Sequence, residues 1–253
     1  MILHHRFDGP EDAPVLVLSN SLGATTAMWE PQLPALTARF RVLRYDRRGH
    51  GESPVPPGPY TIDELGGDAL ETLDSLGLER VSFCGLSLGG AVGIWLASRA
   101  PERIARLAVC CSAARFGTPD VWDERAALAR AGGVEVLADA VLERWFTQAF
   151  RAAEPEAIAR TRAMLVSTPA EGYAGCCEAL RDCDLRDDLG RIGAPTLVVS
   201  AADDPAAPPE QGALLANGIP GARLVVIPDA AHFANVEQPQ AFNRTLLESF
   251  GAS

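Results

Sequence analysis

A glycine-rich turn, Gly85-Leu86-Ser87-Leu88-Gly89-Gly90, follows the apolar run Val81-Ser82-Phe83-Cys84 and precedes a helical stretch from Ala91 to Ala100. In this strand–turn–helix context, the G-x-S-x-G pattern predicts a serine held on a sharp, strained turn. The glycines are required because side chains two residues to either side of the serine would collide with neighbouring backbone. The helix would direct its free N–H groups and positive dipole end toward an anion developing beside the serine. The turn therefore predicts a nucleophilic serine at the carboxyl end of a buried strand.

Short apolar runs recur on both sides of this turn and alternate with helical stretches. A capping box, Thr61-Ile62-Asp63-Glu64, opens a helix that Gly77 ends, and Pro239 begins the last helix. Strands that alternate with helices imply β-α-β units and a mostly parallel sheet flanked by helices. The expected strands are Val15–Leu18, Arg41–Asp46, Val81–Cys84, Leu107–Cys110, Thr196–Val199 and Leu224–Ile227.

The segment 115–187 differs from the rest because it lacks a β-branched run and is rich in Ala, Arg and Glu. We expect several helices here, inserted between two strands. The chain is therefore divided into a first part of the α/β core (1–114), a helical cap (115–187) and a second part of the core (188–253). The aromatic residues of the cap would pack it onto the core, and some would line the roof of a pocket: Trp122, Trp145, Phe146, Phe150 and Tyr173.

The charge of the chain excludes several classes of chemistry. Among its 253 residues, 22 are basic and 33 acidic, which gives a net charge of -11. Every basic residue is an arginine. The absence of lysine excludes both a Schiff-base lysine and the phosphate-binding lysine of a P-loop. The acidic balance argues against nucleic acid as a partner, because such proteins need clustered positive charge.

The N-terminus and the cysteines indicate a cytoplasmic protein without a membrane anchor. The opening residues lack the apolar core of a secretory signal, and no apolar run approaches the roughly 18 residues of a spanning helix. The cysteines show no zinc spacing, and adjacent pairs are poor disulfide candidates. We expect buried, reduced thiols at Cys84, Cys110, Cys111, Cys176, Cys177 and Cys183.

A nucleophilic serine needs a base, and His232 is the best placed of the four histidines. For a serine on this kind of turn, the order along the chain is serine, acid, histidine. His232 follows the Leu224–Ile227 strand on a loop and leaves room for an acid before it. His4 and His5 have no expected role, and His50 fits a structural role near the border of the site.

The acid is expected after the preceding strand, where Thr196–Ser200 leads into a loop with two candidates. Asp204 is favoured because it lies farther into the loop and directly before Pro205, and Asp203 is the alternative. The aspartate would hold the imidazole in one tautomer and stabilise the imidazolium without taking the proton.

Two backbone N–H groups should bind the oxyanion. One belongs to the residue after the nucleophile, Leu88, and the other to the loop after an earlier strand, where Leu22 is the expected donor. In the same loop, Asn20 and Ser21 are candidates for polar contacts to the substrate, and hydrogen bonding within the loop is the alternative for both.

Together these residues resemble the α/β-hydrolases over nearly the whole chain. The loop Asp46-Arg47-Arg48-Gly49-His50-Gly51-Glu52-Ser53 is similar to that family's D-x-R-G-x-G-x-S loop. The chain departs from relatives at Ala206-Ala207, where they often carry Ser-Thr, and its short N-terminal segment leaves open whether the first edge strand exists. A narrower resemblance, to the 3-oxoadipate enol-lactonases, rests on Asn20-Ser21-Leu22-Gly23 with Met28-Trp29, on Arg144-Trp145-Phe146-Thr147, on 172–185 and on 231–239.

The resemblance implies a carboxylic-ester hydrolase that converts 3-oxoadipate enol-lactone to 3-oxoadipate in the β-ketoadipate pathway of aromatic-compound degradation. It implies a small anionic lactone as substrate, with no metal and no organic cofactor. The alternatives on the same fold are a carboxylesterase, a cofactor-free perhydrolase or haloperoxidase-like protein, and a C–C bond hydrolase. A non-catalytic receptor is a further alternative, which a complete triad disfavours. The sequence does not determine the oligomeric state.

An anionic lactone requires a local cation, because the global field of an acidic protein repels anions. Arginine is the cation available, and it binds carboxylates bidentately. The candidates are Arg144 in the cap and Arg48 on the core loop, and a solvent-exposed or ion-paired arginine is the alternative for each. Arg144 is favoured because it lies beside Trp145. Trp145 and Trp122 are the aromatic candidates for contact with the substrate.

Overall fold

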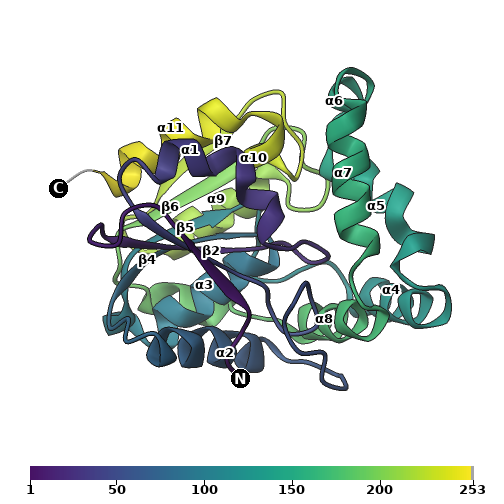
Figure 1. The fold of residues 1–253 in the computed structure, drawn as a ribbon, viewed down its shortest axis with the longest axis horizontal. Coiled ribbons are helices and arrows are strands. Elements are labelled where there is room, and N and C mark those ends of the chain that lie inside the picture. Colours follow the sequence, from purple (N-terminus) through teal and green to yellow (C-terminus); the bar gives the residue numbers. More distant parts are fainter. Residues whose placement is uncertain (252–253) are drawn as a thin grey trace.

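The computed structural model of the protein, which describes residues 1–251, is built around a seven-stranded sheet (Figure 1). The strand order is β1-β3-β2-β4-β5-β6-β7, and every neighbouring pair is parallel except β1 with β3. The α/β fold expected from the alternating pattern is confirmed. The strands are β1 (His5–Asp8), β2 (Val15–Ser19), β3 (Arg41–Tyr45), β4 (Val81–Leu86), β5 (Ile104–Cys110), β6 (Thr196–Ala201) and β7 (Arg223–Ile227).

The first edge strand, which the sequence left open, is present as β1. No sequence pattern predicted it. It pairs antiparallel with β3 and is only four residues long. Its residues are only partly buried, so it lacks the apolar run that marks the strands buried on both faces. β7 forms the opposite edge and is likewise largely accessible.

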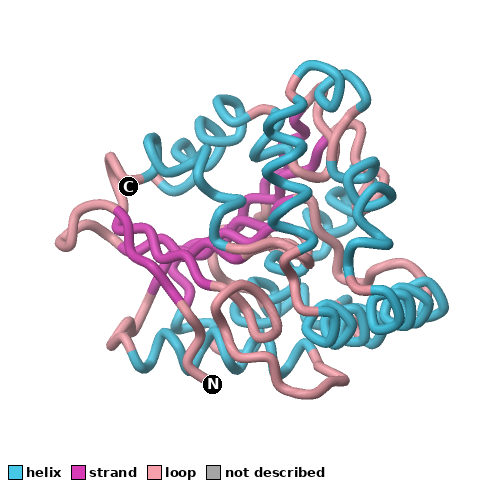
Figure 2. The backbone as a smooth tube through the Cα atoms, turned by 45° about the vertical axis from the view of Figure 1, so that its right-hand side comes forward, coloured by secondary structure: helices cyan, strands magenta, loops and turns pink. Residues whose placement is uncertain are grey.

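Helices cover both faces of the sheet, as the turned view in Figure 2 also shows. On one side α2 packs against α3, and α3 lies directly on β4 and β5; on the other side α1 contacts α11 (Figure 1). The capping box at Thr61 begins α2 as predicted, because both of its hydrogen bonds form. These helices are α1 (Leu33–Leu36), α2 (Ile62–Ser75), α3 (Leu88–Arg99), α9 (Pro209–Gly218), α10 (Ala234–Glu237) and α11 (Pro239–Phe250).

Between β5 and β6 the chain forms five further helices, here called the cap helices, which stand beside the core at the right of Figure 1. The pair α4 and α8 makes extensive mutual contacts, and α5 packs on α7. The cap helices are α4 (Pro119–Gly132), α5 (Ala138–Trp145), α6 (Gln148–Ala153), α7 (Pro155–Val166) and α8 (Ala170–Asp182), and the short 3-10 helices of the chain are η1 (Thr26–Gln32), η2 (Pro101–Arg103), η3 (Val134–Leu137) and η4 (Arg186–Arg191).

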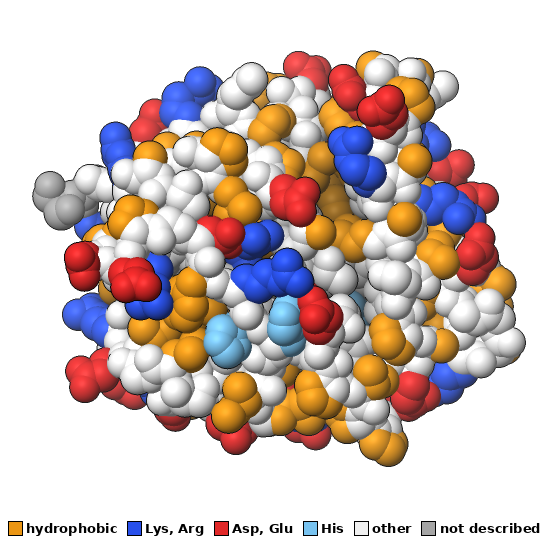
Figure 3. Space-filling model, in the orientation of Figure 1, with side chains coloured by type: hydrophobic (Ala, Val, Ile, Leu, Met, Phe, Trp, Pro, Cys, Tyr) orange, Lys and Arg blue, Asp and Glu red, His pale blue; other side chains and the backbone are white. Residues whose placement is uncertain are grey.

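The surface mixes charges of both signs. Acidic and arginine side chains are interspersed over the face in Figure 3, and pairs such as Arg6 with Glu52 and Arg181 with Asp123 join them. Among residues 1–251, no helix is long and apolar enough to cross a membrane.

Candidate active site

Ser87 occupies the turn between β4 and α3 with a φ of 57°, a backbone conformation that residues other than glycine rarely adopt. A Cβ on Gly85 would overlap the carbonyl group of Gly89, and a Cβ on Gly89 would overlap the carbonyl group of Ser19. The glycines flanking the serine are therefore required by backbone approaching backbone. The turn is also held by the Ser87 N–H, which donates to the Cys110 carbonyl at 2.8 Å.

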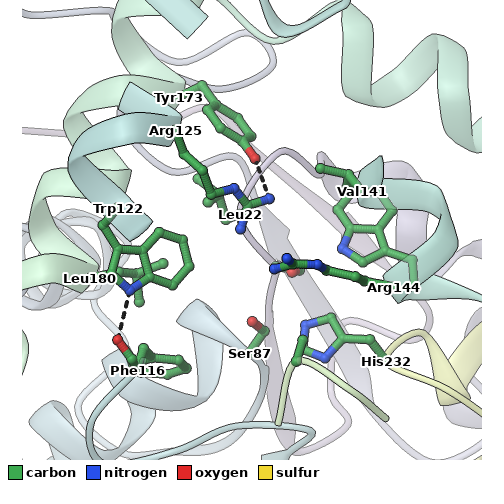
Figure 4. Close-up of a pocket in the computed structure, with 13 residues that line it drawn as sticks. Leu22, Ser87, Phe116, Trp122, Arg125, Val141, Arg144, Tyr173, Leu180 and His232 are labelled. Atoms are coloured by element: carbon green, nitrogen blue, oxygen red, sulfur yellow. Dashed lines mark hydrogen bonds between the residues drawn. The ribbon is translucent and has the colours of Figure 1, made fainter. Parts of the chain in front are cut away.

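The Ser87 hydroxyl faces a cavity between the core and the cap helices (Figure 4). The cavity has about 480 Å³ of empty space, including its mouth. Core loops supply its floor, and α4, α5 and α8 supply its walls. Its lining residues are Ser21, Leu22, Ser87, Phe116, Trp122, Arg125, Val141, Arg144, Trp145, Tyr173, Leu180, Ala206 and His232.

His232 lies beside Ser87 in this cavity (Figure 4) and is paired with Asp204. The distance from His232 Nδ1 to Asp204 Oδ2 is 2.8 Å, and both side chains are buried. The other carboxylate oxygen, Oδ1, accepts the Ala206 and Ala207 N–H groups at 2.8 and 3.0 Å. Backbone donors thus stabilise the carboxylate at the position where relatives often carry Ser-Thr. The alternative acid, Asp203, is exposed at the surface.

The loop that carries His232 is hydrogen-bonded to the C-terminal end of α5, a helix that carries three cavity residues. The Phe233 N–H donates to the Trp145 carbonyl at 2.9 Å, and the two rings stack with centroids 4.0 Å apart. The buried Glu237 carboxylate accepts the Ala231 N–H at 2.9 Å and the Thr147 hydroxyl at 2.8 Å. Burial raises the pKa of Glu237, and these hydrogen bonds oppose the rise. The end of α5 and His232 are therefore fixed relative to each other.

The two predicted oxyanion donors border Ser87. Leu22 lines the cavity, and Leu88 is the first residue of α3. Within residues 1–251, neither N–H group donates a hydrogen bond to another protein atom. Two free N–H groups beside a serine hydroxyl form the kind of donor set that an oxyanion needs.

Of the two polar residues predicted to contact substrate from this loop, Asn20 and Ser21, one lines the cavity and the other does not. Ser21 lines the cavity. The structure does not place Asn20 there, because its side-chain amide donates to the Tyr45 carbonyl and accepts the Trp29 indole N–H, each at 2.9 Å. Asn20 therefore follows the alternative of hydrogen bonding within the protein.

The structure also separates the two candidate arginines. Arg144 points into the cavity (Figure 4), and within the described chain it has no ion-pair partner. Arg48 is not a cavity residue: its guanidinium is held by Asp68 at 2.5 Å and by Glu64 at 2.7 Å on α2. Arg48 therefore follows the alternative of an ion-paired arginine and is not the candidate for the substrate carboxylate, since two carboxylates already neutralise it.

A second cavity arginine, Arg125, was not predicted. Its guanidinium donates to the Tyr173 hydroxyl at 2.9 Å and lies 5.1 Å from the Trp122 ring centroid (Figure 4). Trp122 also lines the cavity, and its indole N–H donates to the Phe116 carbonyl at 2.7 Å. Helical spacing could have predicted Arg125 from the candidate Trp122, because residues 122 and 125 are three apart and share one face of α4.

Within residues 1–251, no group of three or more His, Cys, Asp or Glu side chains is arranged to hold a metal ion. The six cysteines are free and buried. Burial raises the pKa of the Cys176 thiol to about 12, so it is not a second nucleophile at neutral pH.

Comparison with known proteins places this geometry in a family. The model of the alpha/beta hydrolase fold matches residues 14–239, which is most of the chain. The chain belongs to the α/β-hydrolase family. The strained serine turn and the strand order agree with this membership.

Within that family, the narrower resemblance to enol-lactonases is also confirmed. The chain is 42% identical over 244 residues to 3-oxoadipate enol-lactonase 2 of Acinetobacter baylyi, covering 96% of this chain and 91% of that protein. The crystal structure of the enol-lactonase from Burkholderia xenovorans LB400 superposes with a TM-score of 0.97 at 50% identity, covering 98% of this chain and 96% of that one. A putative carbamate hydrolase, RutD of Stutzerimonas stutzeri, is 34% identical, covering 97% of this chain and 95% of that protein.

Proposed function

We propose that this protein hydrolyses 3-oxoadipate enol-lactone to 3-oxoadipate, in the β-ketoadipate pathway of aromatic-compound degradation. The observation that carries the proposal is the shared cavity of Ser87, His232 and two arginines. A serine with a paired histidine supplies acyl transfer, and an arginine supplies a site for the carboxylate of the lactone. The similarity to enol-lactonases over nearly the whole chain supports the same substrate.

In the first half of the reaction, Ser87 Oγ attacks the lactone carbonyl carbon while His232 Nε2 takes the hydroxyl proton. Asp204 binds Nδ1, which leaves Nε2 for this role. The carbonyl electron pair moves onto oxygen, and the Leu22 and Leu88 N–H groups bind the oxyanion. When the intermediate collapses, the bond to the ring oxygen breaks and His232 returns the proton to it. The leaving group is an enol, which is easier to expel than a simple alcohol.

The second half releases the acyl group from Ser87. His232 takes a proton from water, and the resulting nucleophile attacks the ester carbonyl carbon. The same N–H groups bind the second oxyanion, and its collapse returns the proton to Ser87 Oγ. Hydrolysis of the serine ester releases a second carboxylate beside the one that the substrate already carried. The enol formed by ring opening tautomerises separately to the ketone. This route uses only side chains and water, with no metal or organic cofactor.

The cap helices are proposed to form a cap over the active site, within the predicted boundaries 115–187. They contribute both cavity arginines together with Trp122 and Trp145. We assign the lactone carboxylate to Arg144, with Arg125 as a second cation fixed by Tyr173. The six free, buried cysteines fit a reducing compartment, and we place the enzyme in the cytoplasm.

The direct test follows the loss of ultraviolet absorbance of the enol-lactone with the purified protein. We expect kcat/KM above about 10⁴ M⁻¹ s⁻¹, the lower end for enzymes acting on their own substrates. A neutral ester such as 4-nitrophenyl acetate, which lacks the carboxylate, should be hydrolysed with a much lower kcat/KM. Hydrolysis of the simple ester with no activity on the enol-lactone would contradict the proposal and favour a carboxylesterase.

Replacing Arg144 by alanine should raise KM for the enol-lactone by about 10-fold, because a charge-assisted hydrogen bond to the substrate is lost. KM for 4-nitrophenyl acetate should change less than about 3-fold, since that ester offers no carboxylate to pair with. Arg160→Ala is the matched control, because Arg160 lies on α7 outside the cavity and its side chain is 73% exposed. Equal effects of Arg144→Ala on both substrates would remove Arg144 from carboxylate binding.

A further inference from the structure

We propose that His50 is a positioning residue of the oxyanion hole, which holds the Asn20–Gly23 loop so that the Leu22 N–H faces the reacting carbonyl oxygen. The inference rests on the proposed function in one respect, the assignment of Leu22 as an oxyanion donor. His50 itself does not line the cavity, so it acts through the loop and not on the substrate.

The contact that carries the proposal is a single buried hydrogen bond. The Gly23 N–H, which follows Leu22 directly, donates to His50 Nε2 at 2.9 Å. His50 is fully buried. Because Nε2 is the acceptor, the ring proton belongs on Nδ1, which faces the Arg48 carbonyl at 3.3 Å. Burial and the nearby Arg47 lower the pKa of His50 to about 3, so the ring stays neutral and remains an acceptor at neutral pH.

The other end of the oxyanion loop is held by the same segment of the core. The Arg47 guanidinium, buried beside His50, donates to the Asn20 carbonyl. Asn20 is fixed in turn through its side chain, which leaves Ser21 and Leu22 as the loop residues that face the cavity. The D-R-R-G-H loop thus binds residue 20 on one side of the donor and residue 23 on the other.

Gly23 cannot be held in place by a side chain of its own. Its φ is +74°, and a Cβ there would overlap Leu165 of α7. The Gly23 position is therefore held through its backbone, where the N–H donates a hydrogen bond to His50 Nε2. Removing the acceptor would leave a buried N–H unpaired and free the loop to shift.

The loop that carries His50 is anchored on both sides. The Asp46 carboxylate accepts the Thr26 N–H at 2.8 Å, and the Gly49 N–H donates to the Pro54 carbonyl at 2.8 Å. On the cap side, the Gly49 backbone packs directly against Gly172 of α8, where a Cβ on either residue would overlap the other backbone. His50 is therefore a fixed point from which the oxyanion loop can be positioned.

A displaced oxyanion donor weakens binding of the transition state and leaves ground-state binding unchanged, so kcat should fall while KM stays constant. His50→Leu removes the acceptor from a side chain of similar volume. We expect kcat to fall about 10- to 100-fold, with KM within about 3-fold of wild type, on both the enol-lactone and 4-nitrophenyl acetate. His50→Gln places an amide oxygen near the position of Nε2 and should keep kcat within about 5-fold of wild type.

The two variants separate positioning from a general structural role. If His50→Leu does not fold, His50→Asn replaces it, because the shorter amide does not reach Gly23 and should lower kcat in the same way. The pH profile of kcat should be the same in wild type and His50→Gln, since a neutral His50 contributes no titration. A kcat of His50→Leu within 3-fold of wild type would overturn the proposal, and so would an equal loss in His50→Gln or a parallel rise in KM.

The ester assay keeps this inference distinguishable from the proposed function. Ser87 should hydrolyse 4-nitrophenyl acetate whatever the natural substrate is, and the same oxyanion donors would act on it. If wild type hydrolyses the ester and not the enol-lactone, the substrate assignment fails while the His50 comparison is still decided on the ester. If the ester rates are unaffected by His50→Leu while the enol-lactone is a good substrate, the positioning role fails alone.

Discussion

Replacing Ser87 by alanine should lower kcat on the enol-lactone by at least about 10⁴-fold, because no acyl-enzyme can form. The free N–H groups and the arginines of the cavity remain, so the small residual rate is that of water attack on a bound, polarised lactone. The backbone at residue 87 should keep the same strained conformation in wild type and Ser87→Ala, because the turn imposes the φ of 57° and the hydroxyl does not. Binding of product-like carboxylates should therefore be unchanged.

The measurement combines the absorbance assay with calorimetric binding of a small dicarboxylate. Ser98→Ala is the matched control, because Ser98 lies on the same helix, α3, and its hydroxyl donates to the Trp95 carbonyl away from the cavity. Ser98→Ala should keep kcat within about 2-fold. Turnover by Ser87→Ala at more than a hundredth of the wild-type rate would show that the reaction does not pass through a serine ester.

The local patterns predicted the strand–turn–helix around Ser87 because the physical requirement spans few residues. A strained turn needs glycines at fixed offsets, and the structure has them against backbone. The order of serine, acid and histidine along the chain then reduced the choice of base to one residue. The structure brings His232 and Asp204 to 2.8 Å because both follow neighbouring parallel strands, β7 and β6, whose carboxyl ends lie at the same edge.

Contacts between distant segments could not be predicted in the same way. Arg48 was a reasonable candidate for a substrate carboxylate until α2 placed Asp68 and Glu64 against it. Arg125 faces the cavity because α4 packs against α8, where the Arg125 guanidinium donates to the Tyr173 hydroxyl. No local spacing specifies that these two side chains meet. Residues whose role depends on which segments meet require the tertiary structure, whereas residues whose role depends on a turn do not.

The same distinction applies to the histidine at position 50. Its sequence context suggested a structural residue near the site, which agrees with its complete burial. The acceptor bond to Gly23 joins two loops separated by 27 positions and could only be found in three dimensions. The positioning role proposed for His50 therefore rests on a contact that the sequence could not show.

Asp204→Asn should lower kcat by about 10³- to 10⁴-fold with little change in KM. The reason lies in how the carboxylate is bound. Oδ1 accepts two backbone N–H groups, from Ala206 and Ala207, so the single oxygen of an asparagine would stay there. Its amide group would then face His232 Nδ1 and donate to it, which forces the ring proton onto Nε2. A protonated Nε2 cannot accept the proton of Ser87, so the base would be in the wrong tautomer.

Asp203→Asn provides the matched comparison, because the neighbouring side chain is exposed and its backbone N–H already pairs with the Ala230 carbonyl at 2.9 Å. We expect kcat of Asp203→Asn within about 3-fold of wild type. Both variants should be assayed at several pH values on protein whose thermal unfolding midpoint has been measured. If Asp203→Asn were the inactive one, the acid would be reassigned. If Asp204→Asn kept more than a tenth of the wild-type kcat, the backbone donors at Ala206 and Ala207 would not be fixing the amide, and the tautomer argument would fail with them.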